Sequence, residues 1–309
     1  MTPLPLIIFV PGLRPKPEPF IHRAELLRCL HEGIARINGK CAQDLRSHPD
    51  GFELIAWTFP FYGEHYDIEL DRAGIEAVLE TRGASDLDRA EANSLRLRLL
   101  RALYWLADEL PFDVPPLGNE KLELHLRDLS RYVRNIDGVA DNTRAMLQEP
   151  LLKAASEGRA ILLIGHSMGC VIAYDALWQL GREAGDAFKL DTLLTLGSPL
   201  SQNLVRRDLL GHDQEGARRY PDNIQNWTNI AAIGDLTAIK KSAKECYFEM
   251  LELALTDNID DQTTYNWFRN HGSDGELNIH SEYGYLINEA VAALVANWWT
   301  TKRGLTKPA

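Results

Sequence analysis

The pattern GHSMG at residues 165–169 is the part of this sequence that could most directly perform chemistry. A short apolar run, Ile161–Ile164, precedes the pattern. Small and apolar residues, as in a buried helix, follow it at positions 170–173. A G-x-S-x-G turn between a strand and a helix places its serine on a strained corner with the hydroxyl exposed. The two glycines leave room for the helix to pack tightly against the strand. We therefore predict Ser167 as a nucleophile.

A serine hydroxyl attacks effectively only when a base takes its proton and a carboxylate orients that base. Asp235 follows an apolar segment through Gly234, and His280 stands in the last loop before an apolar terminal segment. Serine, then acid, then histidine is the chain order found around such a serine. We predict Ser167 as the nucleophile, His280 as the general base and Asp235 as the acid that orients it.

Other residues compete for these roles. His271 is a second late histidine, and Ser198 is a rival nucleophile that lacks the strand-to-helix corner and precedes a proline. Asp191 is a competing acid inside an expected strand. The remaining competing acids fall in what we expect to be a polar loop: Asp257, Asp260 and Asp261. His166 points away from Ser167 by alternation and is expected to be structural.

The elements that must position these residues form an α/β pattern. Apolar runs predict buried strands at residues 4–10, 52–59, 159–164, 190–196 and 223–233. An aromatic loop is expected at residues 61–66, and a helix at 20–37. Residues 67–149 are helical in pattern, with a proline-rich break at 111–116, and form an insertion that either caps the site or flanks the sheet. An apolar stripe with a period of four predicts a terminal helix over residues 286–299.

Together these features resemble the α/β-hydrolase superfamily, most closely lipase-like serine esterases that begin directly with a central strand. The resemblance rests on the GHSMG motif, the Gly197-Ser198-Pro199 turn and the W-x-N-x-x-x-x-x-D run that ends at Asp235. It implies one α/β-hydrolase domain over residues 1–309, with a mostly parallel sheet flanked by helices and with residues 67–149 as the helical insertion or cap.

The resemblance also implies an oxyanion hole. Leu13 and Met168 would supply its two backbone N–H groups, with Leu13 in the loop after the first strand. In this sequence Pro11-Gly12 replaces the family's usual His-Gly pair, and Gly12 is expected to permit a tight turn. The implied reaction is hydrolysis of a carboxylic ester through an acyl-enzyme intermediate.

The composition of the chain narrows the classes of molecule that we expect it to bind. The sequence has 44 acidic and 33 basic side chains, a formal net charge of −11, which argues against nucleic acid or anionic lipid as a default partner. No metal-ligand spacing and no dinucleotide-binding glycine pattern occurs, so no metal and no cofactor are expected. The N-terminus is a poor signal peptide and no transmembrane run is present, so we expect a cytoplasmic protein acting on a small-molecule acyl ester.

The same residues also suit thioesterases and acyltransferases, because fold does not choose among acyl chemistries. A different class of function remains open: a non-catalytic α/β-hydrolase scaffold that binds a ligand or protein partner behind the inserted helices. Reactivity of Ser167 distinguishes the two classes, since a binding scaffold gains nothing from an activated serine.

Overall fold

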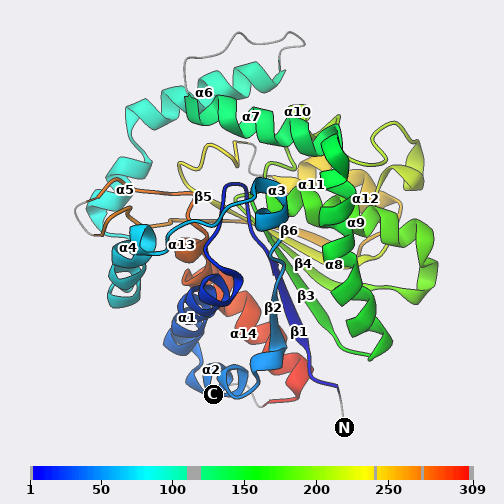
Figure 1. Ribbon diagram of the computed structural model, residues 1–309, viewed down its shortest axis with the longest axis horizontal. Helices are drawn as coiled ribbons and strands as arrows, with labels where there is room; N and C mark the ends of the chain where they lie inside the picture. The colour runs from blue at the N-terminus through cyan, green and yellow to red at the C-terminus, as the bar shows by residue number, and fades with distance from the viewer. Residues whose placement is uncertain (1–2, 110–119, 240–241, 273–274, 306–309) are drawn as a thin grey trace.

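The protein is described by a computed structural model that covers residues 3–109, 120–239, 242–272 and 275–305. Within these ranges the chain forms one six-stranded sheet, in the order β2-β1-β3-β4-β5-β6, with helices on both faces (Figure 1). Every pairing between neighbouring strands of this sheet is parallel. The predicted fold class, an α/β fold with a parallel sheet flanked by helices, is confirmed.

Five of these strands match the predicted apolar runs, and the second is shorter than predicted. The strands are β1 (Leu6–Val10), β2 (Phe52–Leu54), β3 (Ile161–His166), β4 (Leu190–Leu196), β5 (Ile224–Ala232) and β6 (Asn258–Thr264). After β2 the chain turns into a short helix, α3 (Thr58–Tyr62), which includes the start of the expected aromatic loop. Trp57 lies at this turn, and its buried ring donates a hydrogen bond to the Pro11 carbonyl at 2.9 Å.

The sixth strand, β6, was not predicted. We expected Asp257, Asp260 and Asp261 in a polar loop, but the last two lie in β6, which pairs along its length with β5. β6 lies at the edge of the sheet, and Ile259 is its one buried residue. A polar edge strand lacks the apolar run on which strand prediction depends.

Alternate residues of the central strands face two cores. Leu6 and Ile8 of β1 pack with α8 (Val139–Ser156) and α9 (Met168–Glu183), whereas Ile7 and Phe9 pack into a second core, which includes three helices from the two ends of the chain. Those helices are α1 (Pro19–Ile37), α2 (Gly39–Arg46) and α14 (Glu289–Arg303). In the described ranges, no helix has both the length and the apolarity needed to cross a membrane.

The predicted terminal helix over residues 286–299 corresponds mainly to α14. Leu286 is the last residue of a separate short helix, α13 (Glu282–Leu286), and Asn288 then begins α14 by accepting a hydrogen bond from the Ala290 amide at 3.0 Å. Three further short helices follow β4 and β5: α10 (Asn203–Arg206), α11 (Ala243–Cys246) and α12 (Phe248–Glu252).

The α-helices between α3 and β3 occupy different positions in the fold. In chain order they are α4 (Glu69–Glu80), α5 (Asp86–Ala92), α6 (Leu95–Glu109), α7 (Glu120–Val133) and α8. α8 packs beside α9 and contacts β3, and α4 contacts α1 and α13. α6 and α7 lie across the end of the sheet at which β1 and β3 terminate (Figure 1). The predicted break at residues 111–116 lies outside the described residues.

Gly33 offers a test of the packing of α1. A Cβ at this position would lie 2.8 Å from the carbonyl oxygen of Ile287, between α13 and α14. We expect Gly33→Ala to lower the free energy of unfolding by about 2 kcal/mol, because overpacking outweighs the better helix propensity of alanine. Urea denaturation measures the effect.

Gly39→Ala is the matched control for this prediction. Gly39 begins α2, and a Cβ there would meet nothing within 4 Å. This substitution should leave the free energy of unfolding unchanged or raise it slightly. Equal effects of the two substitutions would contradict a close contact at Gly33.

Candidate active site

Ser167 occupies the corner between β3 and α9. Its backbone angles are φ 55° and ψ −123°, a region that few residues other than glycine adopt. Such a conformation costs on the order of 1–3 kcal/mol and persists only where its surroundings hold it. Here the Ser167 amide donates to the Leu196 carbonyl at 2.9 Å, and the Cys170 amide donates to the Ser167 carbonyl at 3.0 Å.

Three glycines leave the space that this corner needs. A Cβ on Gly169 would collide with the Val10 carbonyl, and one on Gly165 would lie 2.9 Å from the backbone of Cys170. A Cβ on Gly12 would lie 2.8 Å from the Cβ of Ser167. Gly12 does not have a positive φ, and its close approach to Ser167 is a reason for glycine at this position that the sequence did not reveal.

Asp235 and His280 lie together at the same end of the sheet. His280 Nδ1 lies 2.8 Å from Asp235 Oδ2. Because an ionised carboxylate only accepts hydrogen bonds, Nδ1 carries the proton and Nε2 of the neutral ring is left as an acceptor. The Asp235 side chain is fully buried and that of His280 is 28% exposed. Gly197 lies against both, since a Cβ there would be 2.8 Å from Asp235 Oδ2 and 3.0 Å from the His280 ring.

Asp235 is held as a carboxylate by several donors. Tyr285 donates its hydroxyl to Oδ2 at 2.8 Å, and the Thr237 amide donates to Oδ1 at 2.8 Å. Burial alone would raise the pKa of Asp235, but His280 and these hydrogen bonds outweigh burial and lower that pKa below its ordinary value. Tyr285 also accepts from the Ala232 amide at 2.8 Å, which ties the acid to the end of β5.

Ser167 and His280 are connected through His166. The rings of His166 and His280 have centroids 4.7 Å apart, and His166 Nε2 donates to the His280 carbonyl at 2.9 Å. His166 is therefore a buried structural residue, as its sequence position predicted. Within the described ranges, no hydrogen bond joins the Ser167 hydroxyl directly to His280. Hydrogen bonds of this kind are often long until a substrate is bound.

The predicted oxyanion donors, Leu13 and Met168, both lie next to Ser167. Met168 is the first residue of α9, so its N–H has no intrahelical acceptor. Leu13 follows Gly12, which abuts Ser167, and its N–H has no acceptor among the residues that the structure describes. The N-terminus of the 16-residue helix α9 adds a partial positive charge that favours an anion at this point.

The competing residues lie elsewhere or have structural roles. Ser198 Oγ accepts the Leu200 amide at 3.2 Å and so shapes its own turn. His271 is exposed in a surface turn. Asp191 is near the start of β4, where Trp298 and Lys302 bind its carboxylate. Asp261 accepts hydrogen bonds from the backbone at the start of α11.

Behind His280 lies a buried charged group that sequence reasoning missed. Glu282 Oε1 accepts from Lys16 Nζ at 2.9 Å and lies 2.7 Å from His22 Nε2, while Oε2 lies 3.5 Å from His166 Nδ1. Burial alone would raise the pKa of Glu282, but Lys16 and His22 hold it well below its ordinary value. Burial lowers the pKa of His166 to about 4, so its ring is neutral at pH 7.

The chemical groups that the described residues bring to this site are side chains and backbone amides. Within them, no group of three or more His, Cys, Asp or Glu side chains is placed to hold a metal ion. Cys170 packs beneath the corner, and burial raises the pKa of its thiol to about 12, so it stays protonated. The groups available for chemistry are therefore Ser167, His280, Asp235 and the neighbouring backbone amides.

Comparison with known proteins assigns no family. No family model matches the chain, and no curated protein matches it. Among solved structures, the chain is similar to the structure of esterase Est22, with 11% identity, a TM-score of 0.31, and 51% of this chain and 54% of that chain covered. A mutant of that esterase gives a TM-score of 0.29 at 11% identity, covering 49% and 52%. The chain thus spans about half the length of that esterase.

The buried Glu282 carboxylate predicts a pH-dependent stability. Because its pKa is lowered on folding, its contribution is present above the ordinary value of 4.5 and is lost as the pH falls through and below that value. Glu282→Gln should lower the free energy of unfolding by about 3 kcal/mol at pH 7, and the difference from the wild type should shrink in acid. Urea denaturation across pH measures both.

Glu289→Gln, at an exposed residue at the start of α14, is the control for this substitution. It should change the free energy of unfolding by less than about 1 kcal/mol at any pH. A Glu282→Gln deficit that stays constant down to pH 3 would contradict a carboxylate stabilised by Lys16 and His22.

Proposed function

We propose that the protein is a serine hydrolase of the α/β-hydrolase superfamily, which cleaves a carboxylic ester of a small molecule. The observation that carries the proposal is the 2.8 Å hydrogen bond between His280 and the buried Asp235, next to the strained corner at Ser167. Few structural roles need an oriented histidine, a buried acid and a strained serine at the end of one parallel sheet, where ligands bind in α/β folds.

The proposed reaction begins at Ser167. Its hydroxyl oxygen attacks the ester carbonyl while His280 Nε2 takes the hydroxyl proton, and Asp235 stabilises the resulting imidazolium. The tetrahedral intermediate collapses, the C–O bond to the alcohol breaks, and His280 returns the proton to the leaving alkoxide. Water then attacks the acyl-enzyme by the same steps, and releases the acid and free Ser167.

The negative charge of each tetrahedral intermediate must be stabilised by hydrogen-bond donors. The N–H groups of Leu13 and Met168 are suited to this role because both lie beside Ser167 and neither is used in secondary structure. Each such donor contributes about 3 kcal/mol to transition-state stabilisation in comparable enzymes. Backbone donors do not depend on the side chain at residue 11, so Pro11 is compatible with the site.

We extend the proposal to the inserted helices: residues 1–309 form one domain, and α5–α7 cap the site. Gly234 supports this, since a Cβ there would lie 2.7 Å from the Ala92 carbonyl at the end of α5. The Asn203 amide donates to Asp108 of α6 at 2.9 Å, and Tyr62 donates to Asp128 of α7 at 2.9 Å. α8 packs on the sheet and belongs to the flanking layer.

A non-catalytic binding scaffold is the second candidate. Two observations favour it: Ser167 is only 6% exposed, and its hydroxyl makes no hydrogen bond to His280 in the described part of the chain. Thioester hydrolysis and acyl transfer use the same residues as ester hydrolysis, and a substrate panel separates them.

Labelling by a fluorophosphonate probe tests the proposal. The wild type should be labelled, because an activated serine attacks the phosphorus and displaces its leaving group. Ser167→Ala and His280→Ala should abolish labelling, whereas Ser198→Ala, at the rival serine, should retain it. A folded wild type that stays unlabelled, or labelling that survives Ser167→Ala, would contradict the proposal and favour the scaffold.

The role of Asp235 gives a second prediction. Asp235→Asn should lower kcat about 10⁴-fold towards any ester the wild type hydrolyses, because the amide no longer holds His280 in the tautomer with Nε2 free. Steady-state kinetics on a p-nitrophenyl ester measures this loss. Asp257→Asn, at an exposed aspartate, should retain full kcat. Near-normal turnover of Asp235→Asn would assign the acid elsewhere.

A further inference from the structure

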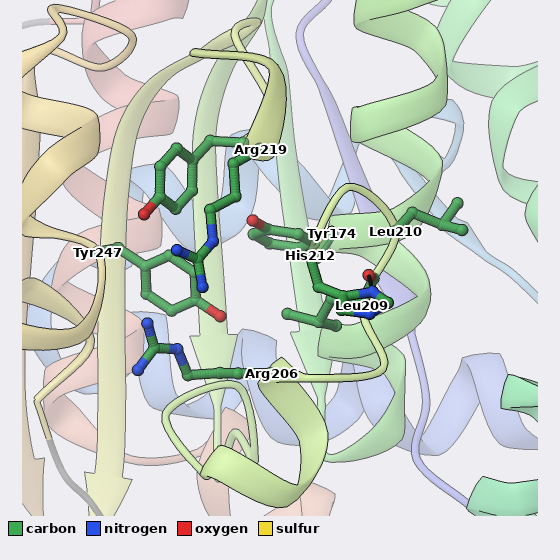
Figure 2. A pocket seen from close by; sticks show the side chains of 8 residues that line it. Tyr174, Arg206, Leu209, Leu210, His212, Arg219 and Tyr247 are labelled. Atoms are coloured by element: carbon green, nitrogen blue, oxygen red, sulfur yellow. Dashed lines mark hydrogen bonds between the residues drawn. The ribbon is translucent and has the colours of Figure 1, made fainter. Parts of the chain in front are cut away.

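A second polar pocket lies beside α9, apart from the candidate active site. Its walls carry Tyr174, Arg206, His212, Arg219, Tyr220 and Tyr247 (Figure 2). Tyr174 stands two helical turns along α9 from Ser167, a distance of about 10 Å. The pocket is open to solvent on one side and small, with room for about one water-sized sphere between the side chains.

Two guanidinium groups converge on this pocket. Arg206 lies over the ring of Tyr247, 5.6 Å from its centroid, and Arg219 lies over the ring of Tyr220 at 5.8 Å. Within the described ranges, neither arginine has a carboxylate partner within 4 Å. The nearby Glu249 accepts the Tyr220 hydroxyl at 2.6 Å instead. In a chain with a net charge of −11, the pocket is thus a local concentration of positive charge.

The hydroxyl of a buried tyrosine completes the pocket. Tyr174 is 2% exposed, and its hydroxyl has no hydrogen-bond partner among the described residues. Figure 2 shows this hydroxyl pointing to the side on which Arg206 and Arg219 lie. The ring of Tyr174 is enclosed by protein but its hydroxyl is not fully enclosed, so an acceptor in the pocket can bind this hydroxyl.

The pocket walls are fixed by α9. Asp175 Oδ1 accepts the Leu210 amide at 2.9 Å and holds the segment that follows α10. Trp178 Nε1 donates to the Arg218 carbonyl at 2.9 Å, and Arg182 donates to the same carbonyl at 2.7 Å. Two side chains of α9 therefore hold the turn that carries Arg219. Less conformational entropy of this turn is then lost when a ligand binds.

We propose that this pocket binds an oxyanion, specifically a phosphate group. One phosphate oxygen enters and accepts the Tyr174 hydroxyl, while the remaining oxygens stay at the open mouth and accept from Arg206 and Arg219. Two guanidinium groups and a hydroxyl suit a tetrahedral dianion better than a planar carboxylate with one charge. The site does not depend on the proposed hydrolase function.

Calorimetric titration of the full chain with inorganic phosphate, at pH 7.5 and constant ionic strength, tests the site. Acetate and chloride titrations under the same conditions distinguish phosphate from a carboxylate and from general counter-ion binding. The wild type should bind phosphate more tightly than acetate and show no heat with chloride. Its thermal midpoint should rise with phosphate concentration.

Substitutions of the pocket residues test whether phosphate binds in this pocket. Arg206→Gln and Arg219→Gln should each weaken phosphate binding about tenfold or more, because each removes charge-assisted hydrogen bonds. Tyr174→Phe removes only the hydroxyl and should weaken binding about threefold to tenfold. Arg207→Gln, at an exposed neighbour, is the matched control and should bind as the wild type does.

Two outcomes would overturn the proposal. One is an equal response to phosphate, acetate and chloride, which would indicate surface counter-ions only. The other is an affinity for phosphate that Arg206→Gln, Arg219→Gln and Tyr174→Phe all leave unchanged. Circular dichroism of each variant establishes that it is folded, and Tyr174→Phe keeps the ring in the core should an arginine variant prove unstable.

Discussion

The approach of the first turn of α9 to the end of β1 is the contact on which the site depends. Gly169 has no room for a methyl group because the Val10 carbonyl occupies that space. The contact is possible because β1 and β3 are neighbours, although β2 comes between them in the sequence. After β1 the chain passes to β2, on one side of β1, whereas β3 and β4 follow on the other side of β1. The loops that follow β1 and β3 therefore lead in opposite directions. Leu13 and Ser167 lie at this divergence.

Asp235 and His166 hold His280 from different directions, and a second buried carboxylate, Glu282, lies behind His166. Asp235 binds its ring, and Glu282 lies against His166, which binds its backbone carbonyl. Burial opposes the charge of both acids, but each has enough donors or cations around it to stay ionised at neutral pH. The His280 side chain and backbone are thus fixed independently, which leaves the ring oriented without a direct bond to Ser167.

The sequence predicted those features of the fold that depend on local patterns of residues. Buried strands β1 and β3–β5 are apolar runs, and the corner at Ser167 is a motif of five residues, so the fold class and the position of Asp235 shortly after a strand could be predicted. β6 was not, because an edge strand needs few apolar residues. Tyr285 and the Glu282 group were also missed. Lys16 and His22 meet Glu282 across 266 and 260 residues of sequence, and no spacing rule connects positions so far apart.

The polar residues of α9 argue that this helix does more than support Ser167. A buried helix face packs equally well with apolar side chains, yet Tyr174 and Asp175 both carry buried polar groups. Asp175 has partners, since it binds the Leu210 amide and the Tyr132 hydroxyl. The Tyr283 hydroxyl elsewhere also lacks a partner, but protein encloses it fully. Tyr174 differs because its hydroxyl lines a pocket that two guanidinium groups share. Arg206 also donates to the Cys246 carbonyl at 3.2 Å, but neither arginine has a carboxylate partner among the described residues, and an anion in the pocket would accept from both arginines and from Tyr174.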